Sequence, residues 1–305
     1  MPKGDTNRKK RAVKPAAGIS VRASRDGDQF HYLWAARRCL TLLSPDSEVV
    51  AIAIEGASPS ENQPGLRNVG EDVIDLAEYL GSEDLAGASC VRYMQFKHST
   101  LHPTKPWVLS GLKKTLEEFA KRYSKLEQDG LAQKVEFSFV TNRPIESYIL
   151  ETLADLGQGT PPRHPDWARK MGELTKLDTG FVAAFYSAVS FVPDQDDYWD
   201  QRNLLFQDAA GYLPEADYDA PVQLKELVTR KALSEAVGKN VIRRADLLHA
   251  FNTLEDRLFP APCRIDQVAN AVPREQEPEL IETIIRAADV PVIIRNSSGR
   301  AGILE

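Results

Sequence analysis

Two acids and a Gln-x-Lys sequence stand in three successive apolar segments of this chain of 305 residues. The residues are Glu55, Asp75, Gln95 and Lys97. Side chains of a β-strand alternate between its two faces, so Gln95 and Lys97 point the same way. If the three segments form neighbouring strands, both acids and the lysine meet on one side of a small sheet.

Such a group of residues can hydrolyse a phosphodiester bond. Carboxylate oxygens bind hard cations such as Mg²⁺ or Mn²⁺. A cation held in this way polarises the phosphate and generates hydroxide from bound water. A lysine beside it positions or deprotonates the attacking water and stabilises the charge that develops on phosphorus. The pattern therefore predicts a metal-dependent nuclease site with Glu55, Asp75, Gln95 and Lys97 as catalytic residues.

Each residue also has an ordinary structural explanation. Glu55 can mark the end of a strand before Gly56. Lys97 can protect an edge strand from pairing, and Gln95 can be a plain polar residue on a strand face. Asp75 is the strongest candidate because strands are depleted in aspartate and a half-buried carboxylate needs a partner or a metal.

Several nearby residues remain open as members of the site. Asp72, with Glu71 beside it, is an alternative to Asp75 as the metal ligand. His31 lies in the first predicted helix, where it can reach either the metal or the nucleic-acid backbone, although a histidine on a helix face is more often simply packed. His98 falls on the strand face opposite Lys97 and is left out of the catalytic set.

The elements that must position these residues follow from apolar periodicity. The pattern predicts a helix over 27–43, three strands, a strongly amphipathic helix, a fourth strand and another helix. The strands cover about 49–55, 72–79, 90–98 and 134–141, and the two later helices cover 107–126 and 145–156. This order predicts an α/β protein in which helices cover a sheet, with a core of α-β-β-β-α-β order.

The second half of the chain reads as mostly helical. A loop is expected at 157–170, an edge strand within 184–192, helices at 198–213, 221–236, 243–256 and 277–288, and a short strand at 289–295. Residues 214–290 are either a linker or a regulatory or oligomerisation element.

The composition indicates a globular protein of the reducing cytoplasm. The length allows about two domains of roughly 150 residues each. Three widely separated cysteines provide neither a disulfide framework nor a zinc-ligand pattern. No apolar run has the ~18 residues that a membrane helix needs, and the N-terminus has no signal-peptide core. The net charge of −6 counts mildly against a nucleic-acid partner, although the first 17 residues form a basic tail that we expect to be disordered.

Four segments together resemble the PD-(D/E)xK nuclease superfamily: 27–38, 54–56, 73–79 and 94–99. They resemble most the double-stranded DNA endonuclease domains of bacterial antiphage systems, which are joined to STAND or NACHT-type NTPases or to cyclic-oligonucleotide sensors. The resemblance implies a restriction-endonuclease-like fold. It also implies metal binding by Glu55, Asp75 and the main-chain carbonyl of Phe96, with Gln95 at the variable acid-or-glutamine position and Lys97 as the lysine.

The resemblance further implies a polar residue from the first helix, for which both Gln29 and His31 qualify. It suggests a nuclease domain over 18–212, a helical segment over 213–290, and at 291–305 the start of a truncated or degenerate NTPase module. The expected partners are double-stranded DNA, a sensor or NTPase module and a second copy of the chain, with no membrane. The alternative function is a catalytically inactive, nuclease-like module that docks DNA or protein.

Overall fold

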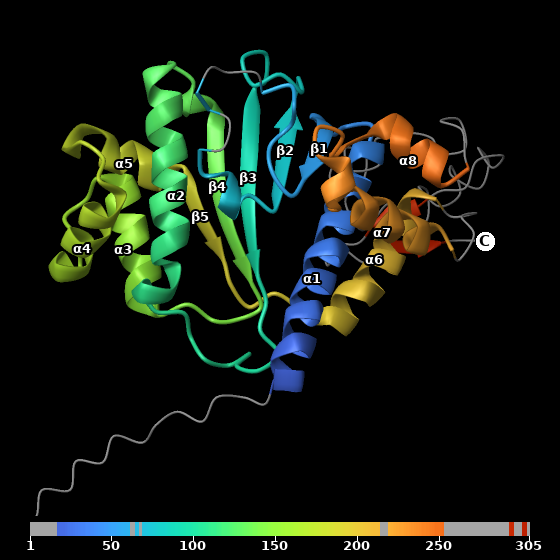
Figure 1. Ribbon diagram of the computed structural model, residues 1–305, viewed down its shortest axis with the longest axis horizontal. Helices are drawn as coiled ribbons and strands as arrows, with labels where there is room; N and C mark the ends of the chain where they lie inside the picture. Colours follow the sequence, from blue (N-terminus) through green and yellow to red (C-terminus); the bar gives the residue numbers. More distant parts are fainter. Residues whose placement is uncertain are drawn as a thin grey trace, which may run out of the picture.

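The computed structural model describes residues 17–61, 65–66, 69–213 and 219–252, together with the backbone of two short strands at 293–295 and 301–303. The chain folds as a mixed α/β protein around an open sheet of six strands. Helices cover both faces of this sheet, with α2 to α5 on one side and α1, α6 and α7 on the other (Figure 1).

The central sheet has the order β5-β4-β3-β2-β1-β6. β1, β2 and β3 form an antiparallel meander, while β4 and β5 add in parallel beside β3. Parallel neighbours need a crossover, which α2 provides before β4 and α3 to α5 provide before β5. The strands are β1 (Val49–Ile54), β2 (Leu76–Leu80), β3 (Cys90–Lys97), β4 (Val135–Thr141), β5 (Val189–Val192) and β6 (Val241–Arg243).

The helices pack their apolar sides on the two sheet faces. α2 carries the clearest apolar stripe, and its residues at helical spacing from Leu109 to Leu126 are buried against the sheet. The helices are α1 (Ala17–Cys39), α2 (Leu109–Gln128), α3 (Ser147–Gln158), α4 (Pro165–Thr175), α5 (Thr179–Ser187), α6 (Tyr198–Tyr212), α7 (Ala220–Lys231) and α8 (Arg244–Ala250).

Strand alternation divides the interior into two cores. Ala77, Tyr79 and Tyr93 belong to the core under α2, whereas Leu76 and Phe96 belong to the core under α1. We call these two sides of the sheet the α2 face and the α1 face. The division matters because it decides which helix each candidate site residue can meet.

The predicted order α-β-β-β-α-β-α is confirmed through α3. One boundary is wrong at the site itself, because β2 begins at Leu76, and residues Glu71–Val73 form a 3₁₀ turn rather than the start of a strand. Asp75 therefore precedes β2 instead of interrupting it. Its amide still donates to the carbonyl of Met94 at 2.9 Å, so Asp75 is held against β3 like a strand residue.

One prediction between β4 and α6 is wrong, because the expected loop at 157–170 contains the start of α4. The edge strand expected within 184–192 is confirmed as β5, which covers the last four of these residues, while α5 extends to Ser187. The three prolines favoured a loop, but Pro165 occupies the first turn of α4, where a missing amide hydrogen costs nothing.

The segment that follows α6 contributes to the sheet. β6 pairs antiparallel with β1, placing Ile242 opposite Ile52, and α7 contacts α1. α8 confirms part of the predicted helix at 243–256, and β7 (Ile293–Arg295) falls within the strand predicted at 289–295, paired with β8 (Ala301–Ile303). The basic tail before Ala17, the helix predicted at 277–288 and most of the predicted NTPase start lie outside the described residues. The division of the chain into domains stays a prediction.

Candidate metal centre

Three side chains meet at one end of the meander. His31 comes from α1, Glu55 follows the last residue of β1, and Asp75 precedes β2. A ring nitrogen of His31 and one carboxylate oxygen from each acid all lie within 4.8 Å of one another. We call His31, Glu55 and Asp75 the candidate metal centre.

A sharp bend at the end of β1 places Glu55. Its φ is 51°, a left-handed conformation that is uncommon outside glycine, and Gly56 follows with a φ of 123°. The amide of Glu55 donates to the carbonyl of Asp75 at 2.9 Å, which keeps the bend beside the start of β2. Gly56 suits this position because a side chain there would be strained, and its Cβ would also lie 3.4 Å from the Glu71 carboxylate.

Asp75 is tied to β3 by its side chain as well as its backbone. Its Oδ2 accepts a hydrogen bond from the amide of Phe96 at 2.5 Å. The amide and carbonyl of a strand residue point towards the same neighbouring strand. The carbonyl of Phe96 therefore also faces the side on which Asp75 stands.

Lys97 completes the arrangement from the end of β3. Every second residue of a strand lies on the same face of the sheet. Asp75 therefore shares the α2 face with Ala77, and Lys97 shares it with Tyr93. Lys97 is exposed, and its positive charge acts on all three members of the candidate metal centre. Asp75 and Lys97 therefore lie on the same face of the sheet.

The pKa values of Glu55 and Asp75 are both raised. Desolvation and the neighbouring charges of Asp75 and Asp28 raise the pKa of Glu55 to about 7, against the influence of Lys97. Desolvation raises the pKa of Asp75 to about 6, although the Phe96 amide and Lys97 both lower it. Glu55 itself remains exposed to solvent, so a cation from solution can reach it. Neutralisation by a cation would relieve the repulsion between the two carboxylates.

His31 is set up as a neutral ring. Desolvation, followed by the charge of Lys97, lowers its pKa to about 4. A hydrogen bond to the backbone of Phe96 acts in the opposite direction and raises the pKa of His31. Only a hydrogen-bond acceptor favours the protonated ring, so the partner is the Phe96 carbonyl. A ligating histidine often donates its second ring N–H to a carbonyl, which fixes the tautomer and the ring orientation. The Phe96 carbonyl thus orients His31, in addition to its predicted role as a metal ligand.

The structure directs other predicted residues elsewhere. Gln95 is buried and accepts a hydrogen bond from the Thr115 hydroxyl of α2. Asp72 is exposed and lies 3.7 Å from the Lys114 ammonium. Gln29 accepts from Lys225 of α7, and His98 stacks on Phe30 with ring centroids 4.7 Å apart.

Asp28 is the residue near the site that the sequence analysis missed. Its charge raises the pKa of both Glu55 and His31. The available signal was the spacing between Asp28 and His31, because residues three apart share one face of a helix. The same periodicity separates His31 from Gln29, which lies two residues away on a different face.

The donor set fits a divalent cation. Two carboxylate oxygens suit Mg²⁺ and Mn²⁺, and an imidazole nitrogen favours a transition metal. Mn²⁺ is the cation that accepts both kinds of donor best among the two expected from sequence. His31, Glu55 and Asp75 would hold it.

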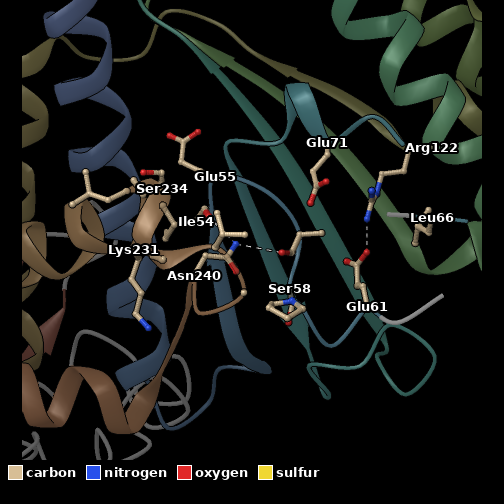
Figure 2. A pocket seen from close by; sticks show the side chains of 17 residues that line it. Ile54, Glu55, Ser58, Glu61, Leu66, Glu71, Arg122, Lys231, Ser234 and Asn240 are labelled. Carbon is tan, nitrogen blue, oxygen red and sulfur yellow. Dashed lines mark hydrogen bonds and ion pairs between the residues drawn. The ribbon is translucent and has the colours of Figure 1, made fainter. Parts of the chain in front are cut away.

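A cavity of about 380 Å³ adjoins the bend at Glu55. Figure 2 shows Glu55 beside Ser234 and Asn240 on one side of the cavity, with Glu71 and Arg122 on the other side. Lys231 ends α7, and Ser234 and Asn240 lie in the segment that follows it. That segment therefore borders the bend at Glu55.

No family model and no curated protein matches this chain. Among solved structures, it is similar to the Cap4 SAVED/CARF-domain containing receptor of Moraxella osloensis, with 14% identity, a TM-score of 0.44, and coverage of 78% of this chain and 50% of the receptor. It is also similar to two structures of the corresponding Acinetobacter baumannii receptor, at 14% identity in each case. Their TM-scores are 0.41 and 0.42, with coverage of 74% and 81% of this chain and 46% and 48% of the receptors, and the second contains the cyclic trinucleotide 2'3'3'-cAAA.

The chain spans about half the length of these receptors. The likeness is too distant to assign a function. Within the part of the chain that the structure describes, no helix is both long and apolar enough to cross a membrane.

Proposed function

We propose that this protein is a metal-dependent DNA endonuclease of the PD-(D/E)xK superfamily with a restriction-endonuclease-like core. One observation carries the proposal: ligand atoms of His31, Glu55 and Asp75 lie within 4.8 Å of one another. Glu55 and Asp75 stand at the ends of adjacent strands, His31 comes from α1, and the charge of the exposed Lys97 acts on all three. Few functions other than metal-assisted hydrolysis need such a group at the rim of a sheet.

A divalent cation at this centre would polarise a phosphate and lower the pKa of a bound water molecule. Glu55 and Asp75 supply the two negative charges that hold it, and His31 supplies a neutral nitrogen. Asp75 is kept in place by the Phe96 amide, and Glu55 by the bend that ends β1. Fixed ligands of this kind need no reorganisation when the substrate arrives.

Lys97 faces solvent and can reach a phosphate group that approaches the two acids. Its ammonium group would position the attacking water and stabilise the negative charge that builds on phosphorus. Gln95 has a supporting role in this proposal, because its side-chain oxygen is engaged by Thr115. The hydrogen bond to α2 fixes the end of β3 from which Lys97 projects.

Double-stranded DNA as the substrate, little sequence preference and a role as an antiphage effector rest on the sequence resemblance. Regulation by a sensor or NTPase module, through assembly into oligomers, has the same basis. Each of these statements is part of the proposal, and the geometry of the candidate metal centre is independent of them.

The first test is a calorimetric titration of the full chain with Mn²⁺ and Mg²⁺. We expect one cation to bind to wild type and binding to be lost in Asp75→Asn. Because this measurement does not require DNA cleavage, it remains valid if activity depends on assembly. A wild-type protein without detectable binding would contradict the proposal.

The second test is nicking of supercoiled plasmid with Mn²⁺. Lys97→Met should abolish nicking, whereas Lys114→Met, an exposed lysine on α2, provides a matched control that should retain it. Equal nicking by wild type and Lys97→Met would show that the activity comes from another site or from a contaminant.

A further inference from the structure

Asn240 lies beside the bend that places Glu55. It immediately precedes β6, in the segment that follows α7. Since Val241 pairs with Ala53 of β1, Asn240 lies beside the next residue of β1, Ile54. The residue is buried, with 8% of its surface exposed. A buried primary amide must find hydrogen-bond partners, and those of Asn240 all belong to the chain around Glu55.

Three hydrogen bonds join Asn240 to this bend. The main-chain amide of Ile54 donates to the main-chain carbonyl of Asn240 at 3.0 Å. In return, Asn240 Nδ2 donates to the carbonyl of Ile54 at 2.9 Å and to the carbonyl of Ala57 at 3.3 Å. Glu55 and Gly56 lie between these two carbonyls, so one side-chain nitrogen holds both sides of the bend.

The bend needs such an external contact. Glu55 adopts a left-handed conformation that a side chain with Cβ disfavours, and it persists only when the surroundings impose it. Without the Asn240 amide, the carbonyls of Ile54 and Ala57 would each lose a donor, the first in a buried and the second in a partly buried position. The chain could then relax towards an extended strand, in which alternation from Ala53 would direct Glu55 to the α2 face, away from His31 of α1.

We propose that Asn240 is a positioning residue for the candidate metal centre, holding the Glu55 carboxylate within reach of His31 and Asp75 through the carbonyls of Ile54 and Ala57. The inference rests on the proposed function, because it assigns the purpose of the contact to metal binding. It also makes the segment after α7 part of the site, although the ligands themselves come from α1 and the meander.

A second contact from the same segment provides a matched control. Arg243 binds Glu83 through two nitrogens at 2.7 and 2.9 Å, and Glu83 accepts from the hydroxyls of Ser58 and Ser60. This contact fixes the loop beyond Ala57 and does not touch the two carbonyls around Glu55. Loosening it tests whether any weakening of the segment is enough to disturb the site.

The experiment is Mn²⁺ titration of the full chain by calorimetry, with thermal unfolding recorded for each variant. Asn240→Asp keeps the size of the side chain but replaces the donor with an oxygen that faces two carbonyls. Loss of a residue that orients a metal ligand typically weakens metal affinity about 10- to 100-fold, and we expect a loss in this range. Arg243→Gln should bind Mn²⁺ within about twofold of wild type.

A double-mutant cycle with Glu55→Gln separates positioning from general stability. If Asn240 acts through Glu55, Asn240→Asp should change the residual Mn²⁺ affinity of Glu55→Gln by less than about twofold. If Asn240→Asp does not fold, Asn240→Ala removes the donor without adding a charge and is read in the same way.

Wild-type affinity in folded Asn240→Asp, or an equal loss with and without the Glu55 carboxylate, would overturn the positioning role and leave the metal centre intact. Failure of wild type to bind Mn²⁺ is a different result. It would reject the proposed function, and the positioning role with it.

Discussion

Two groups of side chains built around carboxylates differ in how far the fold itself satisfies them. The first is a cluster of Glu61, Tyr79, Tyr93 and Arg122, which we call the structural cluster. Glu61 accepts from the Tyr79 hydroxyl at 2.5 Å, from the Tyr93 hydroxyl at 2.7 Å, and from the Arg122 guanidinium. The second is the candidate metal centre, where the charge of Asp75 acts on Glu55 and the pKa values of both acids are raised.

The difference teaches how a structural acid is distinguished from a functional one. In the structural cluster the cation is supplied by Arg122, a buried residue of α2 that also donates to the Val69 carbonyl at 2.9 Å. In the candidate metal centre Lys97 is exposed to solvent. The fold leaves the second group with excess negative charge, which a cation from solution can neutralise.

The largest effect should come from breaking the structural cluster. Arg122→Met leaves Glu61 buried without its cation, and loss of one partner of a buried ion pair costs about 3–5 kcal/mol of unfolding free energy. Urea unfolding at pH 7 measures this loss. The double variant Glu61→Gln with Arg122→Met should recover much of it, since no charge is then left buried.

An Arg122→Met protein as stable as wild type would contradict the assignment of this cluster to stability. Affinity for Mn²⁺ offers a second distinction between the two groups. Where Arg122→Met still folds, its affinity for Mn²⁺ should be close to that of wild type.

Removal of the Lys97 ammonium should lower the nicking activity and leave the stability almost unchanged. Lys97→Met is expected to lower the nicking rate by about 100-fold or more, because the side chain acts on the developing charge at phosphorus. Its unfolding free energy should stay within ~0.5 kcal/mol of wild type, since the residue is exposed. A variant that loses stability while it retains nicking activity would assign Lys97 to the fold instead.

The sequence predicted the frame of the site because the frame depends on local patterns. Strand alternation in β3 and β4 and the apolar stripe of α2 are set by nearby residues. The two acids were found because each interrupts or ends an apolar run. The same reasoning could not exclude Glu78, an acid within β2, which the structure pairs with Arg38 of α1 at 2.5 Å.

The remaining features depend on contacts between distant segments. His31 and Gln29 were equal candidates, and the choice depends on the side of α1 that faces the meander. Asn240 precedes a strand of three residues, too short for a periodic signal. Its partners are carbonyls of β1 and the following bend, which no sequence pattern identifies.

Acid should weaken metal binding at the candidate metal centre. A cation competes with protons on Glu55, whose pKa is about 7, and on Asp75, whose pKa is about 6. Affinity for Mn²⁺ should therefore fall about 10- to 30-fold between pH 8 and pH 6. Calorimetry in two buffers of different ionisation enthalpy measures the protons released, which should increase as the pH falls through this range. Affinity that is independent of pH would place the metal on other ligands.

The smallest effect concerns stability without metal. The folded-state pKa of Glu55 is raised, so folding disfavours its charged form and stability is lost as pH rises from about 4.5 to about 7. Glu55→Gln removes this loss and should raise the unfolding free energy at pH 8 by at most about 1 kcal/mol, because solvent screens the exposed carboxylate. At pH 4 the variant and wild type should be equally stable. A destabilising effect at pH 8 would mean that the ionised carboxylate supports the fold.

The most direct test of the difference between the two groups is the anomalous scattering of Mn²⁺ in crystals soaked with the ion. One peak is predicted within bonding distance of His31, Glu55 and Asp75, with none at Glu61. A peak bound to other residues, or an absence of signal at saturating Mn²⁺, would contradict the metal centre and the nuclease function proposed from it.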